Sequence, residues 1–202
     1  MRRGTAPGLL REAARDVFAE RGYRATTREI AERAGVSPDL LFRYFDSKER
    51  LFFDAVATPM LDAVDGLHQR WLLDPEFKTM DLEQVVSRFV TGFYGFMSEN
   101  RSIARAMVHL FNEGSTEGGE LELLRERISG TLQSMTAPVD AYLEAQGVPP
   151  SSPGLPLRIV LLLVGVVANF LPNTYAVDSE VPPQPAIIDE LARFIYHGLR
   201  GT

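Results

Sequence analysis

Two helix starts that follow one another closely near the beginning of the chain restrict its fold more than any other feature. Thr26 is followed three residues later by Glu29, the pattern of a capping box at a helix N-terminus. Gly35 is expected to end that helix after about two turns. Ser37 can then cap a second helix, with Pro38 at its first position, where a missing N–H costs nothing. The sequence therefore predicts two short helices joined by a tight turn.

An amphipathic segment precedes this pair, with small and apolar residues at helical spacing and Gly22 as its expected stop. Two short helices joined by a turn that contains glycine have the geometry that places the second helix in a DNA major groove. Leu41 and Phe45 are four residues apart and should face inward. The residues left to project are Pro38, Asp39, Leu40, Arg43 and Tyr44. An ordinary hairpin inside a helical bundle is the alternative interpretation.

The charge distribution separates the first fifty residues from the rest. Residues 1–50 contain eleven Lys or Arg and eight Asp or Glu, so 11 − 8 = +3, whereas the whole chain carries −6 and the remainder therefore −6 − 3 = −9. A basic segment on an acidic body indicates that only one part meets a polyanion. Lys48 opens the next expected helix, where its ammonium and the backbone N–H groups can hold one phosphate.

Residues 8–52 resemble the N-terminal domain of the TetR family of transcriptional regulators. The matching segments are AARDVFAERGY (13–23), TTREIAERAGVS (26–37) and LFRYFDSKERL (41–51). The resemblance implies that Thr27 and Arg28 contact phosphates. It implies that the third helix, capped by Ser37, reads bases through Pro38, Asp39, Leu40 and Arg43, with Tyr44 and Lys48 completing the interface.

Two positions depart from the family pattern. Glycine is common where Asp39 stands. The Asp39 carboxylate either accepts a hydrogen bond from a cytosine amino group or interacts favourably with the positive end of the helix dipole in the first turn. A tyrosine is common where Phe42 stands, and Phe42 has no hydroxyl to bond a phosphate, so it is not counted as a contact.

The whole chain is expected to be all-α, with about nine helices and no alternating strand pattern. Residues 1–50 would form the three-helix DNA-binding domain with its helix–turn–helix, and residues 51–202 a helical ligand-binding and dimerisation domain. Segment 157–171 is apolar on all sides, which predicts burial on all sides. The resemblance implies a homodimer through 157–171 and 186–199, with Val164 at the interface; burial within one chain is the alternative.

The middle of the body is rich in aromatic residues and methionine. By analogy with the family, helices four to seven would enclose a small, largely apolar or aromatic effector. The candidate ligand-binding residues are Trp71, Phe89, Phe93, Met97, Met107, Phe111, Met135, Tyr142 and Asn169. Any one of them can instead be ordinary core, and Asn169 can instead form an interfacial hydrogen bond.

Enzyme chemistry is not expected. There is no Cys, the three His are scattered without metal-ligand spacing, and no phosphate-binding glycine loop or nucleophile elbow occurs. No cofactor and no metal are therefore predicted. The most apolar stretch, 159–168, is shorter than the roughly 20 residues that span a bilayer, and the N-terminus lacks a signal-peptide pattern, which predicts a cytoplasmic protein without a membrane partner.

The expected function is that of a ligand-responsive transcriptional regulator. It would bind a double-stranded, palindromic operator and repress transcription from it. The rival hypothesis is a helical interaction module whose N-terminal hairpin binds a protein. The two differ in salt dependence, because binding through phosphates weakens steeply as salt is added.

Overall fold

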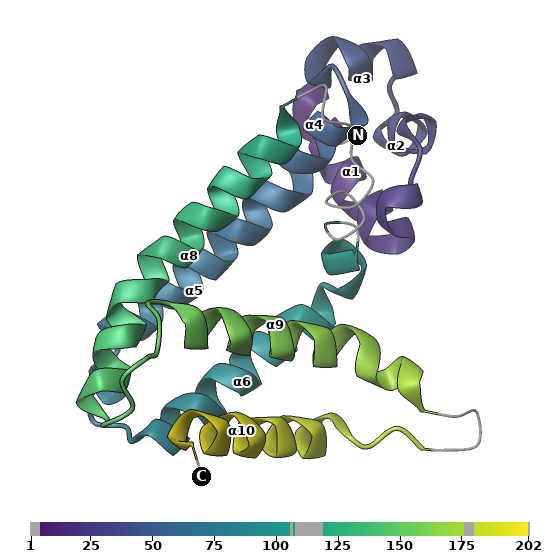
Figure 1. The fold of residues 1–202 in the computed structure, drawn as a ribbon. Coiled ribbons are helices and arrows are strands. Elements are labelled where there is room, and N and C mark those ends of the chain that lie inside the picture. The colour runs from purple at the N-terminus through teal and green to yellow at the C-terminus, as the bar shows by residue number, and fades with distance from the viewer. Residues whose placement is uncertain (1–4, 106, 108–118, 176–179, 202) are drawn as a thin grey trace. The chain divides into compact units, whose positions relative to one another are not determined.

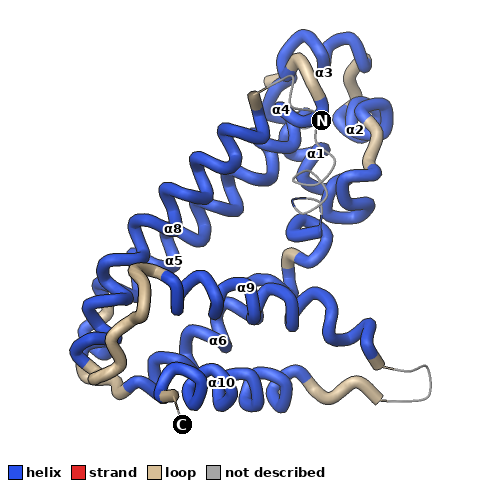
Figure 2. The backbone as a smooth tube through the Cα atoms, viewed as in Figure 1, coloured by secondary structure: helices blue, strands red, loops and turns tan. Residues whose placement is uncertain are grey.

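The computed structural model describes residues 5–105, 107, 119–175 and 180–201, and in these ranges the ordered elements are helices, with no strand (Figures 1 and 2). The all-α prediction is therefore confirmed. The chain divides into two units: residues 1–65 with 102–129, and residues 66–101 with 130–202. None of the described helices is long and apolar enough to cross a membrane.

The first unit begins with four helices that we call the head. They are α1 (Ala6–Arg21), α2 (Thr27–Ala34), α3 (Pro38–Phe45) and α4 (Lys48–Phe52), with the 3-10 turn η1 (Gly22–Arg24) after α1. The π-helical turn η2 (Phe53–Ala57) follows α4 and leads into α5 (Thr58–Leu73). Both α5 and α8 (Glu120–Ala145) contribute residues to both units.

Side-chain caps set the boundaries of the head helices. Thr26 Oγ1 accepts from Glu29 N at 3.2 Å, and the Glu29 carboxylate accepts from Thr26 N at 2.9 Å, so the predicted capping box is confirmed. Gly35 ends α2 at φ 71°, in the left-handed region that glycine enters without a Cβ clash. Ser37 Oγ then accepts from Leu40 N at 3.4 Å and starts α3.

A single apolar cluster fixes the head helices against one another. The rings of Phe18 and Phe52 meet edge to face at 5.0 Å, which joins α1 to α4. Leu41 is 0% exposed and Phe45 2%, as the four-residue spacing predicted. Each such fully buried side chain stabilises the fold by about 1.5–3 kcal/mol relative to an exposed one. Burial of Leu41 and Phe45 therefore fixes the orientation of α3 and determines which of its residues face outward.

The first-unit portions of α5 and α8 lie side by side (Figure 1). Arg127 of α8 forms ion pairs with Asp62 and, at 3.3 Å, with Asp65, both on α5. These side chains are partly or largely exposed, so the pairs orient the helices more than they stabilise them.

The second unit consists of α6 (Leu82–Glu99), α9 (Leu155–Phe170), α10 (Gln184–Arg200), the second-unit parts of α5 and α8, and the 3-10 turns η3 (Pro75–Lys78) and η4 (Leu171–Thr174). Helix α6 contacts both α9 and α10. The core between them contains Val90, Tyr94, Val164 and Ala168, each at most 1% exposed.

Within the single chain, segment 157–171 is buried on one side only, so burial within one chain does not account for its whole surface, and burial by a partner stays a prediction. One side of α9 packs into the unit's own core, and that side includes Val164 at 0% exposure, so Val164 does not lie at an outer interface. The opposite side is open. We call it, with one residue of α10, the exposed apolar face: Leu155, Ile159, Leu162, Val166 and Phe170 of α9, and Phe194 of α10.

Candidate functional site

The outward side of α3 presents a continuous set of exposed side chains. Asp39 and Arg43 are exposed one helical turn apart, and Tyr44 is 47% exposed beside them. Pro38 is also exposed, whereas Leu40 is half-buried. Arg11 of α1 lies over the Phe45 ring at 5.3 Å, which fixes α3 from its inner side. The structure therefore brings the predicted base-reading residues together on one short, anchored helix; their contact with DNA stays a prediction.

Phe42 belongs to the same surface, although sequence reasoning set it aside because it lacks a hydroxyl. It is 45% exposed and lies one turn from Asp39 and beside Arg43. An exposed aromatic ring on a reading helix can contact a thymine methyl group, which needs no hydroxyl. The signal that could have found it is its position three residues after Asp39 on the projecting side.

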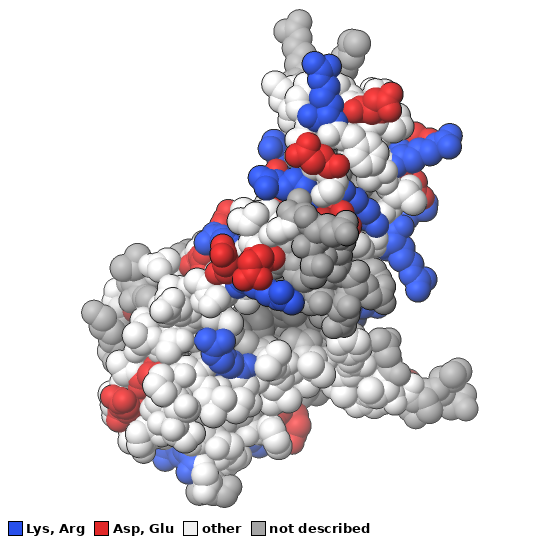
Figure 3. Space-filling model, turned by 45° about the horizontal axis from the view of Figure 1, so that its top comes forward, with Lys and Arg blue, Asp and Glu red and all other residues white. Residues whose placement is uncertain are grey.

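The start of α2 presents an exposed arginine, Arg28, and a half-buried threonine, Thr27. Thr27 is half-buried beside the Thr26 cap. Arg28 is exposed, and its Nε donates to Glu32 at 3.1 Å, with side-chain exposures of 82% and 64%. An exposed pair of this kind contributes only about 0.3–0.5 kcal/mol, so Arg28 can exchange Glu32 for a phosphate at small cost. In the space-filling view, basic side chains are frequent over the first unit, with acidic ones among them (Figure 3).

Lys48 is engaged within the head rather than projecting freely. Its Nζ donates to the Tyr23 carbonyl oxygen at 2.5 Å and lies 4.1 Å from the centroid of the Tyr23 ring. Burial lowers the pKa of Lys48, and the nearby Glu49 carboxylate opposes that shift. Tyr23 Oη in turn donates to Glu49 at 2.6 Å. Lys48 and Glu49, in the first turn of α4, therefore both contact Tyr23, and Lys48 must exchange or share its carbonyl partner to hold a phosphate.

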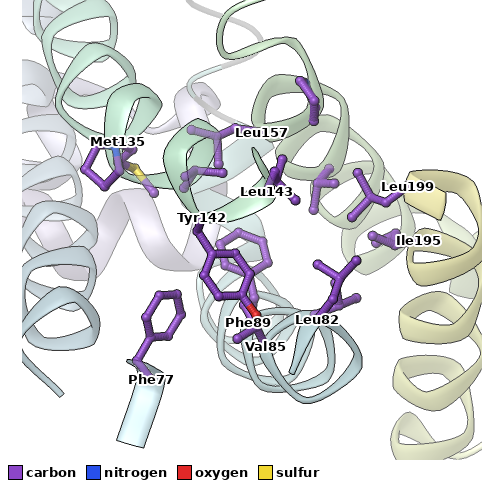
Figure 4. Close-up of a pocket in the computed structure, with 15 residues that line it drawn as sticks. Phe77, Leu82, Val85, Phe89, Met135, Tyr142, Leu143, Leu157, Ile195 and Leu199 are labelled. Carbon is purple, nitrogen blue, oxygen red and sulfur yellow. The ribbon is translucent and has the colours of Figure 1, made fainter. Parts of the chain in front are cut away.

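An apolar cavity of about 100 Å³ lies in the second unit, which we call the cavity (Figure 4). Side chains from α6, α8, α9 and α10 line it, together with Phe77 of η3. The lining contains no charged residue among those described, and its one polar group is the Tyr142 hydroxyl. Tyr142 Oη donates to the Met80 carbonyl oxygen at 3.2 Å, and burial, with a smaller effect of Asp81, raises its pKa. This chemistry suits a neutral, apolar molecule.

The predicted ligand-binding residues fall into several groups. Phe89, Met135 and Tyr142 line the cavity. Phe93 stacks on Phe89 at a centroid distance of 5.6 Å, and Met97 packs against the same core without lining the cavity. Met107 is buried in the core of the first unit. The side chain of Trp71 and the whole of Phe111 lie outside the described residues.

Asn169 is 5% exposed and does not line the cavity. Its Nδ2 donates to the Gly165 carbonyl oxygen at 2.9 Å within α9, while Oδ1 is buried without a partner among the described residues. The cavity differs from the expected place, because α9 and α10 supply much of its wall. Sequence reasoning missed their lining residues because a cavity wall and an ordinary core have the same apolar pattern.

A capped helix–turn–helix with an exposed second helix, attached to an all-helical body, defines a helix–turn–helix DNA-binding protein. Residues 10–55 match the model of the family described as bacterial regulatory proteins, tetR family. Residues 10–55 therefore carry the N-terminal domain of that family, whose proteins are DNA-binding regulators.

Three relatives illustrate the range of proteins that the chain resembles. The HTH-type transcriptional activator FasR of Mycolicibacterium smegmatis is 34% identical over 94 residues, 46% of this chain and 41% of FasR. The HTH-type transcriptional repressor KstR2 of the same organism is 35% identical over 85 residues, 42% and 40% of the two chains. These matches thus span about two fifths of each relative's length. The nucleoid occlusion factor SlmA of Shewanella baltica is 28% identical over 188 residues, 88% of this chain and 86% of SlmA.

Solved structures resemble the whole fold. A bacterial regulatory protein of the tetR family from Rhodococcus RHA1 superposes with a TM-score of 0.68 at 23% identity, over 98% of this chain and 96% of that one. Similarity at this level of identity supports the fold of the body as well as the head, and carries no information on its ligand.

Proposed function

We propose that this protein is a transcriptional regulator that binds a specific operator through α3, and that it acts as a repressor. The observation that supports this most directly is the exposed surface of α3, with Asp39, Phe42, Arg43 and Tyr44 on a helix whose inner side is fully buried. Phosphate contacts from Thr27, Arg28 and Lys48 would position α3, and α3 would read the bases. A cytoplasmic location is part of the proposal, since the protein must reach DNA.

We propose a homodimer built through α9 and α10. The exposed apolar face supports it, because Leu162 is 69% exposed and Phe194 68%, and contiguous apolar surface commonly marks an interface. A two-fold dimer presents two heads, so its operator would be palindromic. Half-sites in successive major grooves require the two α3 helices to lie about 34–36 Å apart.

We propose that a small, neutral, apolar effector binds in the cavity. The apolar lining and the single Tyr142 hydroxyl support this class of ligand. Binding would release the operator by a population shift, since a ligand shifts an equilibrium only by its differential affinity for two states. The relatives described above include both an activator and a repressor, so the sign of regulation needs its own measurement.

A second candidate function is a helical module whose head binds a protein partner. The exposed rings of Phe42 and Tyr44 favour it, because aromatic side chains are enriched at protein interfaces. The two candidates differ in salt dependence, because only binding through DNA phosphates must weaken steeply as salt is added.

The test is selection of bound fragments from the source genome, followed by affinity measurements on the enriched sequence between about 50 and 200 mM salt. The expected result is an enriched palindrome whose affinity falls by orders of magnitude across that range. Failure to enrich any sequence, or an affinity that does not change with salt, would refute operator binding. A reporter gene placed behind the selected operator then gives the sign of regulation.

A further inference from the structure

An open crevice in the first unit separates the end of α1 and the turn η1 from residues 102–105. Its volume is about 420 Å³, and we call it the basic crevice. The described residues that line it all belong to the first unit. A Cβ atom at Gly22 would lie 3.8 Å from the Ser102 carbonyl oxygen. The two walls therefore approach each other closely at this point.

Positive charge predominates in the basic crevice. The charged residues among its described lining are three arginines and one glutamate: Arg21, Arg24, Arg105 and Glu20. Glu20 accepts two hydrogen bonds from Arg33, at 3.0 and 2.9 Å, and these bonds hold the pKa of Glu20 below its usual value. Arg21 forms an ion pair with Glu29. The charges of Arg24 and Arg105 are left to determine what the crevice attracts.

Arg24 and Arg105 are both exposed, and neither forms an ion pair with a residue that the structure describes. They belong to opposite walls of the basic crevice, Arg24 to η1 and Arg105 to the segment that follows α6. Two cations that line one crevice repel each other, and an anion bound between them relieves this repulsion. Guanidinium groups bind planar carboxylates and phosphates through paired N–H donors. The hydroxyl of Ser102, on the same wall as Arg105, can donate a further hydrogen bond.

We propose that the basic crevice binds a phosphate group, either free or at the end of a small monoester. A phosphate monoester carries about −1.5 to −2 charges at pH 7 and presents three strong acceptor oxygens. Its charge matches the two guanidinium groups, and its oxygens match the donors of Arg24, Arg105 and Ser102. The volume of about 420 Å³ falls within the roughly 300–1,000 Å³ of small-molecule sites, so the crevice has room for the organic part of a monoester.

This site is distinct from both ligand sites proposed above. The cavity in the second unit has an apolar lining that suits a neutral molecule. The DNA-binding surface consists of α3 and the starts of α2 and α4, whereas Ser102 and Arg105 lie outside the helix–turn–helix. A free small molecule is therefore the expected occupant of the basic crevice, and a DNA phosphate is the alternative that the experiment must separate.

The experiment is a phosphorus NMR titration of glycerol 3-phosphate and, separately, inorganic phosphate against the full chain. It is carried out without DNA and at constant ionic strength. We expect saturable binding with a dissociation constant of about 1 mM or below. Tighter binding of glycerol 3-phosphate identifies the monoester as the source of the phosphate group, and tighter or equal binding of inorganic phosphate identifies the free ion.

Variants assign the binding to the basic crevice. Arg105→Gln and Arg24→Gln should each weaken phosphate binding about tenfold or more, because each removes a charge-assisted hydrogen bond. Arg125→Gln is the matched control: Arg125 is an exposed residue of α8 in the same unit, the change in net charge is identical, and it does not line the crevice. It should bind phosphate as the wild type does. Circular dichroism confirms that the variants are folded.

The possible failures are distinguishable. Wild-type phosphate affinity in Arg105→Gln overturns the inference, and so does an equal loss in Arg125→Gln, because net charge alone would then explain the effect. If Arg105→Gln keeps its phosphate affinity but binds the operator more weakly and with a lower salt slope, the crevice contacts DNA and the inference is wrong. Failure of the chain to select any operator refutes the proposed regulator and leaves the phosphate titration unaffected.

Discussion

Replacing Leu162 with aspartate is expected to convert the dimer into folded monomers. Leu162 is 69% exposed in the single chain, so a partner that covers it would remove on the order of 100 Å² of apolar surface per side chain, or about 2.5 kcal/mol at ~25 cal/mol per Å². The two-fold axis doubles this to about 5 kcal/mol, which weakens dimerisation by three to four orders of magnitude on the basis of about 1.4 kcal/mol per tenfold. Desolvation of the carboxylate adds to the loss.

Val164→Asp on the same helix is the informative comparison. Val164 is 0% exposed within its own chain, so this aspartate would be buried without a partner at a cost of several kcal/mol, comparable with the whole stability of a typical domain. We expect Val164→Asp to unfold the second unit. Leu162→Asp should change the thermal midpoint little, because an exposed site tolerates substitution.

The assays are sedimentation velocity for the association state, circular dichroism for folding and fluorescence anisotropy for operator binding. Leu162→Asp should give a monomer with native helix content and only weak, half-site binding. The reasoning is refuted if Leu162→Asp unfolds as Val164→Asp does, or if it remains a dimer of wild-type affinity.

Three further variants test the head. Lys48→Ala should weaken binding to all DNA sequences about equally and lower the salt slope by about one unit per half-site. Because it also removes the hydrogen bond from Lys48 Nζ to the Tyr23 carbonyl oxygen, urea unfolding should show a stability loss of about 1 kcal/mol. Arg43→Ala should relax base preference at one position per half-site at a cost of about 1–3 kcal/mol, whereas a uniform loss in a binding-site selection would identify a phosphate contact. Hydrogen bonds from Thr26 and the nearby Arg21 guanidinium hold the pKa of Glu29 below its usual value of 4.5. The ionised Glu29 carboxylate therefore adds to the free energy of unfolding above that value. This stabilisation is lost as the pH falls through the lower pKa of the folded state. Glu29→Gln should therefore flatten the acid side of the thermal-midpoint profile, and an unchanged profile would contradict this.

The head could be predicted from sequence because its signals are local. The Thr26–Glu29 capping box, the Gly35 stop and the Ser37 cap each depend on residues within one turn, and each was confirmed. Inward and outward positions on α3 followed from the period of the helix alone.

The body could not be predicted as closely, because its arrangement depends on contacts between distant segments. Val164 and Leu162 are both apolar residues of α9, and only the position of α6 makes one core and the other surface. The engagement of Lys48 with Tyr23 joins residues of α4 and η1 that have no sequence signal in common. The cavity likewise arises where four helices fail to fill the space between them, and no single segment encodes that gap.

The π-helical turn at Phe53–Ala57 implies that the chain carries one surplus residue inside the continuous helical run from Lys48 to Leu73. A π turn accommodates an extra residue in an otherwise α-helical ladder, so the residues before and after it keep their facing. Removing Asp54, whose pair with Arg50 at 3.3 Å is partly exposed, should restore plain α geometry while Phe52 and Leu61 continue to face the core. Deletions inside helices ordinarily rotate everything that follows by about 100°. In this segment we therefore expect the length of the chain, and not only its composition, to vary without rotating the head relative to the rest of the helical run.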